Sequence, residues 1–237
     1  MHKHTVKAYD QEINQLRATV SEMGGLAEAQ IDAAVDALLK RDGEAALKVV
    51  ERDQAIDQLE AEAEKNAIQL IALRAPMADD LRDIIAALKI SSILERTGDY
   101  AKNIAKRTTV LAQAEPIEPM VILPQMARLA MQMVKEVLDA YVGRDAAKAL
   151  QVRERDREVD DLYNALFREL LTYMMENPRT ITPATHLLFI AKNLERIGDH
   201  ATNIAEIVYY SVTGKMMDPA RPKQDDTAFA MVTPPKA

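Results

Sequence analysis

The sequence predicts an all-α protein made of two tandem antiparallel three-helix bundles. Three observations lead there: apolar residues recur at steps of three and four, turn-forming residues are few, and the second half repeats the first. With seven glycines and ten prolines in 237 residues, the chain lacks the many tight turns of an all-β fold. Three helices joined by short connections pack as antiparallel neighbours, so we expect each half to form one bundle.

Three helices are predicted in the first half. The first carries apolar residues at helical spacing from Ile13 to Leu38, and it ends at the turn 41–43. The second ends at Ala75-Pro76, because proline lacks an N–H and disfavours helix in the residue before it. The third runs on to prolines at 116, 119 and 124, which mark a linker. The predicted ranges are 6–40, 44–74 and 79–114.

The second half follows the same plan. Its helices are predicted over 126–141, 146–176 and, after a loop at 177–179, up to about 212. The proline-rich segment beyond Gly214 is expected to be disordered. The predicted units are therefore a first bundle at 1–115, a linker at 116–124, a second bundle at 125–214 and a tail at 215–237.

The clearest repeat is a six-residue motif inside the third helix of each half. Leu-Glu-Arg-Thr-Gly-Asp at 94–99 returns as Leu-Glu-Arg-Ile-Gly-Asp at 194–199, an offset of 100 residues. The earlier helices align at an offset of 103, because the loop before the third helix is three residues shorter in the second half. We therefore expect two similar bundles related by a pseudo-two-fold axis.

Carboxylates four residues apart form a stripe on one face of each motif helix, with an asparagine one turn further on. The preceding helix carries two aspartates at the same spacing. If the second and third helices pack side by side, four carboxylates per half can converge. The candidate metal ligands are Asp53, Asp57, Glu95 and Asp99, and Asp156, Asp160, Glu195 and Asp199, with Asn103, Asn203, Arg96 and Arg196 around them.

Two features of the stripes favour a bound cation. Like charges at this spacing repel, and Gly98 and Gly198 each cost about 1 kcal/mol relative to alanine inside a helix. A glycine at the same place in both halves also indicates a close approach to the backbone. A cation would account for both features, and an all-oxygen shell suits magnesium, manganese or iron, with zinc as a further option. The competing interpretation is a solvated acidic face neutralised by Arg52, Arg96, Arg155 and Arg196.

The sequence gives little support for histidine metal ligands or for catalytic and nucleotide-binding motifs. His200 directly follows Asp199, which turns it off the stripe, so we predict that it lies on the surface, and that His186 packs. The sequence has no P-loop, no dinucleotide-binding fingerprint, no nucleophile elbow and no Glu-x-x-His pair of the ferritin-like di-iron proteins. We therefore expect a protein that is not an enzyme.

Composition bounds the partners and the compartment. A formal net charge of −7 argues against a nucleic-acid binder, and the absence of cysteine excludes disulfides and thiolate metal sites. No apolar run approaches the roughly 18 residues of a membrane span, and no apolar leader follows Met1. We expect a cytoplasmic protein without membrane insertion. With only 4% aromatic residues to fill each core, a homodimer is also expected.

The duplicated Leu-Glu-Arg-x-Gly-Asp motif, each copy set after a helix with Asp-x-x-x-Asp, resembles the PhoU family of phosphate-transport accessory proteins. The segment Tyr-Met-Met-Glu-Asn-Pro-Arg-Thr-Ile at 173–181 resembles it too, and the likeness covers about residues 5–213. It implies two three-helix bundles and a regulator that represses the phosphate-starvation response when phosphate is plentiful. The implied partners are the ATPase subunit of a phosphate ABC transporter and a sensor histidine kinase, which would place the protein peripherally at the inner membrane.

The resemblance also implies multinuclear iron or zinc clusters on Glu95, Asp99, Glu195 and Asp199, with the helix-two aspartates as partners. Thr97 departs from the isoleucine usual at its position, which weakens the case for the first site. Two other functions stay open. A carboxylate-bridged metalloenzyme would need an open coordination position and a base or redox-poised ligands. A purely structural helical dimer would need neither metal nor partner.

Overall fold

The structure, a computed structural model, describes residues 2–117, 121–218 and 227. These residues form α-helices joined by short turns, with no strand among them. The helices are α1 (His2–Lys40), α2 (Gly43–Arg52), α3 (Gln54–Arg74), α4 (Asp79–Leu111), α5 (Ile122–Gly143), α6 (Ala146–Glu154), α7 (Asp156–Glu176) and α8 (Ile181–Thr213), with a 3-10 turn η1 (Pro178–Thr180) before α8. The prediction of an all-α fold with a repeated helical unit is confirmed.

The second predicted helix of each half is in fact two helices. α2 meets α3 at Asp53, and α6 meets α7 at Arg155. At both junctions the chain tightens into a three-residue turn, with Ile56 N–H donating to the Asp53 carbonyl and Glu158 N–H to the Arg155 carbonyl, each at 3.0 Å. Apolar periodicity continues across these junctions, so the sequence pattern could not show the breaks.

The connecting segments fall partly outside the described residues. α5 begins at Ile122, inside the segment predicted as a linker, so Pro124 stands in its first turn, where proline is tolerated. Residues 118–120 of the predicted linker and most of the predicted tail are not described. In the part of the chain that is described, no helix combines the length and apolar character needed to cross a bilayer.

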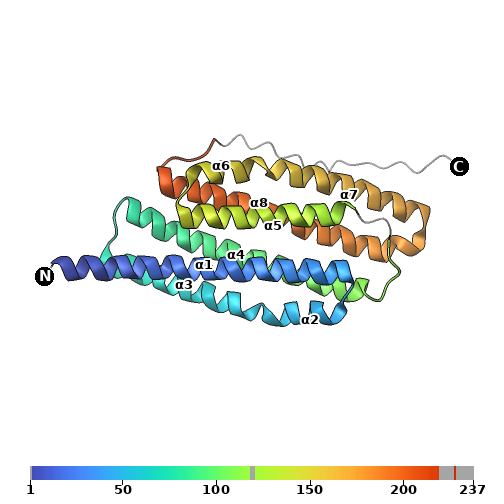
Figure 1. Ribbon diagram of the computed structural model, residues 1–237, viewed down its shortest axis with the longest axis horizontal. Helices are drawn as coiled ribbons and strands as arrows, with labels where there is room; N and C mark the ends of the chain where they lie inside the picture. Colours follow the sequence, from blue (N-terminus) through green and yellow to red (C-terminus); the bar gives the residue numbers. More distant parts are fainter. Residues whose placement is uncertain (1, 118–120, 219–226, 228–237) are drawn as a thin grey trace.

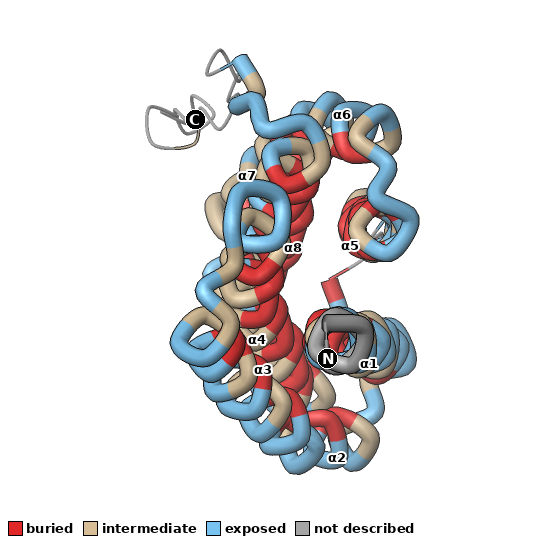
Figure 2. The backbone as a smooth tube through the Cα atoms, turned by 90° about the vertical axis from the view of Figure 1, so that its left-hand side faces the viewer, coloured by how far each residue is buried: buried red, intermediate tan, exposed pale blue. Residues whose placement is uncertain are grey.

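α4 and α8 lie at the centre of the molecule and run in opposite directions (Figure 1). Viewed along the helices, α2 and α3 continue the layer beyond α4, and α6 and α7 continue it beyond α8 (Figure 2). The layer is curved, and α1 and α5 lie on its concave side, against α4 and α8 respectively (Figure 2). Each half is therefore a three-helix bundle whose third helix makes most of the contact with the other half, and α1 and α5 add to it.

The buried core repeats with the sequence. Met23 of α1 and its counterpart Met126 of α5 are both fully buried. The same holds for three aliphatic residues of α4 and their counterparts 100 residues later in α8: Ile90, Leu94 and Ile104, and Ile190, Leu194 and Ile204. Burying a large aliphatic side chain contributes roughly 1.5–3 kcal/mol, so these matched positions stabilise both halves in the same way.

Two adjacent glycines in α1 have different roles. A Cβ on Gly24 would lie 2.8 Å from both Leu138 Cδ atoms, so this glycine lets α5 approach α1 across the two halves. A Cβ on Gly25 would meet nothing within 4 Å. Only the first of the two glycines is therefore required by packing.

Arginines at equivalent positions end the first helix of each half in the left-handed conformation. Arg41 has φ 54° and Arg144 has φ 51°, a conformation that costs a residue with a side chain about 1–2 kcal/mol. The following residue in each case donates its N–H to the carbonyl five residues back, at 2.9 Å, which closes the helix. The Arg41 guanidinium donates to the carbonyls of Leu111 and Ala114, at the C-terminal end of α4.

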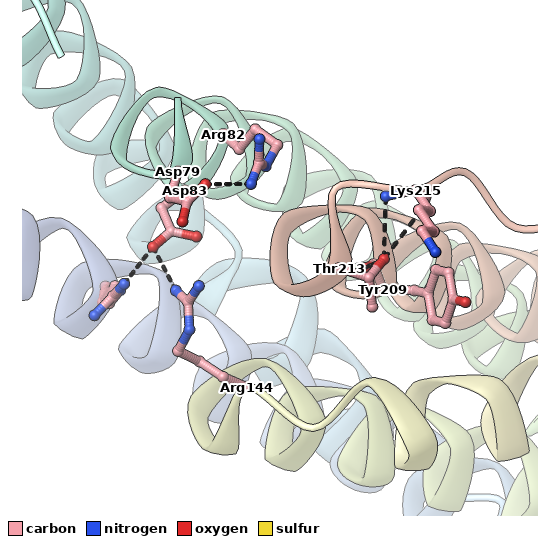
Figure 3. Close-up of polar contacts among 8 residues, drawn as sticks. Asp79, Arg82, Asp83, Arg144, Tyr209, Thr213 and Lys215 are labelled. Atoms are coloured by element: carbon pink, nitrogen blue, oxygen red, sulfur yellow. Dashed lines mark hydrogen bonds and ion pairs between the residues drawn. The ribbon is translucent and has the colours of Figure 1, made fainter. Parts of the chain in front are cut away.

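The Arg144 side chain instead reaches the N-terminal end of α4. It pairs with the carboxylate of Asp83, which also accepts from Arg17 of α1 (Figure 3). The Asp83 side chain is only 11% exposed, whereas that of Asp79, which pairs with Arg82 one turn earlier, is 77% exposed. Asp83 therefore ties α4 both to α1 of its own bundle and to the α5–α6 corner of the other bundle.

Replacing the two α1 glycines by alanine should change stability in opposite directions. We expect Gly24→Ala to lower the free energy of unfolding by about 1–2 kcal/mol, because Leu138 is buried and must shift. Gly25→Ala should raise it by about 0.5–1 kcal/mol, because alanine favours helix and meets no neighbour. Urea unfolding followed by circular dichroism measures both, and changes of equal sign would contradict the packing of α5 on Gly24.

Removing the Asp83 carboxylate should cost more than removing that of Asp79. We expect Asp83→Ala to lower the free energy of unfolding by about 2 kcal/mol, since the largely enclosed Asp83 carboxylate is the shared partner of Arg17 and Arg144. Asp79→Ala should cost at most about 1 kcal/mol, because its ion pair is exposed. Chemical denaturation of the two variants side by side tests this, and equal losses would show that Asp83 does not connect the bundles.

Candidate carboxylate site

In the first half, Asp53 is held at the junction of α2 and α3 and is almost fully buried. Its Oδ1 accepts from Gln30 Nε2 of α1 at 2.9 Å, and its Oδ2 accepts from Lys102 Nζ of α4. Lys102 Nζ also lies 3.4 Å from Asp99 Oδ1. A lysine ammonium thus already stands between two of the predicted metal ligands, and these contacts raise the pKa of Lys102.

The other carboxylates of the first half gather around Glu95. Burial raises the pKa of Glu95, and the nearby charges of Asp99, Glu60, Asp57 and Asp53 raise it further. The prediction placed all of these together except Glu60, which lies one turn beyond Asp57 on the same face of α3. α3 and α4 therefore do bring a group of carboxylates to one side of the first bundle.

In the second half, Glu195 is the buried carboxylate, with a side chain 7% exposed. Its Oε1 accepts from Lys192 Nζ at 2.9 Å, whereas its Oε2 is enclosed and has no hydrogen-bond partner. Burial raises the pKa of Glu195, Lys192 partly offsets this, and Asp199 and Asp160 add to it. An enclosed carboxylate oxygen without a partner is a position that a donor or a cation would stabilise.

The two halves differ at the position of Lys102. Its counterpart 100 residues later is Thr202, whose hydroxyl is fully buried and donates to Asp156 Oδ1 at 3.2 Å. Asp156, the counterpart of Asp53, therefore has a neutral donor where Asp53 has an ammonium. In the second half a lysine from the same helix, Lys192, contacts Glu195.

The predicted close approach to the motif glycines is present at Gly98, where protein atoms make it, whereas Gly198 has neighbours only at ordinary contact distance. A Cβ on Gly98 would lie 2.9 Å from Ile56 Cδ1 and 3.3 Å from Gln30 Oε1. A Cβ on Gly198 would lie 3.4 Å from the methyl carbons of Val159. Gly98 lets α3 pack closely on α4, so no cation is needed to account for that glycine, whereas the contacts at Gly198 do not by themselves require a glycine there.

The prediction that His200 lies on the surface was also wrong. His200 is buried between α8 and α4, with Nδ1 3.3 Å from Thr97 Oγ1 and its ring 5.0 Å from that of Tyr100. Because the Thr97 hydroxyl donates to the Ile93 carbonyl at 2.8 Å, it is free to accept from Nδ1–H of His200. The unusual Thr97 therefore has a structural partner in the other half, which a single motif could not reveal.

The remaining predicted residues lie on α4 and α8. Arg96, Asn103, Arg196 and Asn203 are all exposed, and the Arg196 guanidinium lies 5.8 Å from the centroid of the Tyr100 ring. His186 is half-buried, which agrees with its predicted packing role. Sequence analysis missed Lys102 and Lys192, although each stands three residues from a stripe carboxylate, the spacing at which helical side chains pair.

The carboxylates offer the oxygen donors that hard cations and iron prefer. As the side chains stand, no three histidines, aspartates or glutamates within the described ranges are arranged to hold an ion. Glu195, with its unpartnered oxygen, is the donor most ready to accept one. The metal site stays a prediction, with a stronger geometric basis in the second half than in the first.

Comparison with known proteins matches this architecture. The model of the family described as the PhoU domain matches residues 20–108 and 123–208, one match per bundle. A Zymomonas mobilis protein named phosphate-specific transport system accessory protein PhoU homolog is 57% identical over 94% of either chain. A Caulobacter vibrioides protein of the same name is 53% identical, over 95% of this chain and 98% of its own.

Solved structures agree with the sequence matches. The crystal structure of PhoU from Pseudomonas aeruginosa superposes with a TM-score of 0.84 at 40% identity, over 87% of this chain and all of that one. That of the phosphate transport system regulatory protein PhoU from Streptococcus pneumoniae gives 0.80 at 31% identity, over 89% and 99%. Sequence, repeat and fold agree, and the chain belongs to the PhoU family.

Proposed function

We propose that this chain is a regulatory accessory protein of phosphate transport and not an enzyme. The observation that carries the proposal is the match along nearly the whole chain to proteins named as accessories of the phosphate-specific transport system. Both bundles take part in that match, so the accessory role rests on the complete two-bundle unit. Such a role requires surfaces for partners and a site whose occupancy can differ between conditions.

The partners in this proposal are the ATPase subunit of a phosphate ABC transporter and the sensor histidine kinase that controls phosphate-starvation genes. The protein would act in the cytoplasm, as a homodimer, and repress both uptake and the starvation response when phosphate is plentiful. Support comes from the relatives' names for the transporter; the kinase, the dimer and the location follow from the family resemblance.

The metal part of the proposal is centred on the second half. Glu195, Asp199, Asp156 and Asp160 would hold the ion there, and the unpartnered Glu195 Oε2 supports this choice. A bound ion would supply positive charge that offsets the mutual repulsion of the carboxylates. In the first half Lys102 competes for the same place, so we propose weaker metal binding by Asp53, Asp57, Glu95 and Asp99.

The double substitution Glu195→Ala with Asp199→Ala separates a metal site from a solvated acidic face. If a cation is held there, the variant should lose bound metal and melt at a lower temperature, because each lost ligand weakens an ion that stabilises only the folded state. Helix content should not change. A phosphate-starvation reporter should stay active in phosphate-replete cells. Elemental analysis, thermal melts with and without chelator, and the reporter give the three measurements.

The matched control is Glu95→Ala with Asp99→Ala in the first half, where Lys102 already supplies positive charge. We expect it to lose less metal and to change the chelator-dependent melting less. If the second-half variant instead melts higher, with unchanged metal content and normal repression, the stripe is only a repulsive acidic surface. If metal is lost while repression stays normal, the ion has a structural role and the regulatory claim fails.

Lys102 itself should be needed for the stability of the metal-free protein. Lys102→Met leaves the buried carboxylate of Asp53 with Gln30 as its remaining partner, and we expect the free energy of unfolding to fall by about 1–3 kcal/mol. Lys106→Met, at an exposed position one turn further along α4, should cost less than about 0.5 kcal/mol. Urea denaturation in chelator tests the pair, and equal effects would refute the role of Lys102.

A further inference from the structure

Three arginines of α4 and α8 have no acidic partner: Arg96, Arg107 and Arg196. Within residues 2–117, 121–218 and 227, none of them forms an ion pair with a carboxylate. Arg96 and Arg196 are exposed, and Arg107 is half-buried. The interpretation of the stripes as a solvated acidic face required Arg96 and Arg196 to neutralise carboxylates, and they do not. In a chain of net charge −7, three arginines without a carboxylate are free to bind an anion from outside.

Two of these arginines lie over aromatic rings of the opposite helix. The Arg196 guanidinium of α8 lies 5.8 Å from the centroid of the Tyr100 ring of α4. The Arg107 guanidinium of α4 lies 4.1 Å from the centroid of the Phe189 ring of α8. Tyr100 and Arg107 are seven residues apart, and so are Phe189 and Arg196, which places each pair on one face of its helix. The two contacts are therefore consecutive steps of one row, about 10 Å apart along the helices.

Arg96 extends the row beyond Arg196. Arg96 and His200 are the counterparts of Arg196 and Tyr100 at the offset of 100 residues. Burial lowers the pKa of His200, and the charges of Arg96 and Arg196 act in the same direction, so both guanidinia lie near its ring. That ring is itself 5.0 Å from the ring of Tyr100. We call the following residues the arginine row: Arg96, Tyr100, Arg107, Phe189 and Arg196.

The arginine row is on the side of α4 and α8 that faces away from the other helices of each bundle. Arg107 follows Gly98 by nine residues and Phe189 precedes Gly198 by nine, which is about two and a half turns and hence the opposite side of each helix. Gly98 packs against α1 and α3, and Gly198 packs against α7. Because α1 and α5 lie on the concave side of the helix layer (Figure 2), the row faces away from them. The Phe189 side chain is accordingly 50% exposed.

The chemistry of the row fits several carboxylates on one protein segment. A guanidinium that stacks on a ring keeps the N–H groups at its edge, and these bind carboxylate or phosphate oxygens through paired hydrogen bonds. A single small anion cannot bridge two steps that are about 10 Å apart. Arginine beside exposed aromatic rings is also the composition found at the centre of protein–protein interfaces. An acidic protein segment therefore fits the row better than a free anion does.

We propose that the arginine row is a docking surface for an acidic segment of another protein, whose carboxylates bind Arg96, Arg107 and Arg196. Carboxylates seven residues apart on a helix are about 10 Å apart, which matches the two steps of the row. The carboxylate stripes beside α3 and α7 repel a segment that is displaced sideways, and so restrict it to the row. The inference rests on the proposed accessory role in requiring a protein partner, and it is independent of metal binding.

The binding test uses the full chain and a fluorescently labelled helical peptide with glutamates at seven-residue spacing. The variant combines Arg96→Gln, Arg107→Gln and Arg196→Gln. We expect its affinity for the peptide, measured by fluorescence anisotropy at low salt, to fall at least about tenfold, because all the paired hydrogen bonds are lost. The same peptide with glutamines in place of the glutamates should bind neither protein.

A control variant makes the same change in net charge elsewhere. It combines Lys48→Gln, Lys65→Gln and Arg128→Gln, three exposed positions on α2, α3 and α5, and it should bind the peptide as the unchanged chain does. The single variant Arg196→Gln removes one exposed side chain and leaves the half-buried Arg107 in place. It should lose part of the affinity while its thermal melting stays unchanged, which separates loss of binding from loss of folding.

A second measurement in cells distinguishes failure of the row from failure of the accessory role. Deleting the gene should activate a phosphate-starvation reporter in phosphate-replete cells, and the control variant should restore repression. The triple arginine variant should not restore it. If deletion leaves the reporter unchanged, the accessory role is wrong, and the peptide measurement decides on the row by itself.

Three results would overturn the proposal. The first is equal affinity of the triple arginine variant and the control variant for the glutamate peptide. The second is that inorganic phosphate displaces the peptide and the same concentration of sulfate does not, which would make the row a site for a small anion. The third is full repression of the reporter by the triple arginine variant, which would show that no partner needs the row.

Discussion

The antiparallel packing of α4 against α8 is the constraint on which the rest of the structure depends. Each of these helices is at once the third helix of its own bundle and the contact to the other bundle. Because both faces are occupied, their sequences carry buried residues almost all round, and the carboxylates are confined to the remaining edge, beside α3 and α7. The stripes thus lie where they do because no other part of these helices is free.

Duplication gave the two halves the same scaffold, and later changes made them chemically different. Lys102 and Thr202 occupy one position, yet the first neutralises Asp53 with a full charge and the second only donates a hydroxyl to Asp156. Where α4 and α8 meet, Thr97 of the first motif contacts His200, which directly follows the second motif. A change in either partner would leave the other buried beside a different side chain.

The fold was predictable from the sequence because periodicity and the repeat both report burial, and burial determines how helices pack. The helix breaks at Asp53 and Arg155 could not be predicted, because the turn at each break keeps the apolar residues on the same face. The carboxylate group was predicted because helical spacing is local. Its lysines and the burial of His200 were missed because they depend on which helix lies opposite, and a pattern within one helix does not contain that information.

The two left-handed arginines contact opposite ends of α4. Arg41, from the same bundle, donates to main-chain carbonyls at the C-terminal end of α4. Arg144, from the other bundle, pairs with the carboxylate of Asp83 near the N-terminal end of α4. A swivel of one bundle against the other would leave the first contact intact and break the second. Any separation of the two bundles at the corner near Asp83 would therefore have to break the ion pair between Asp83 and Arg144.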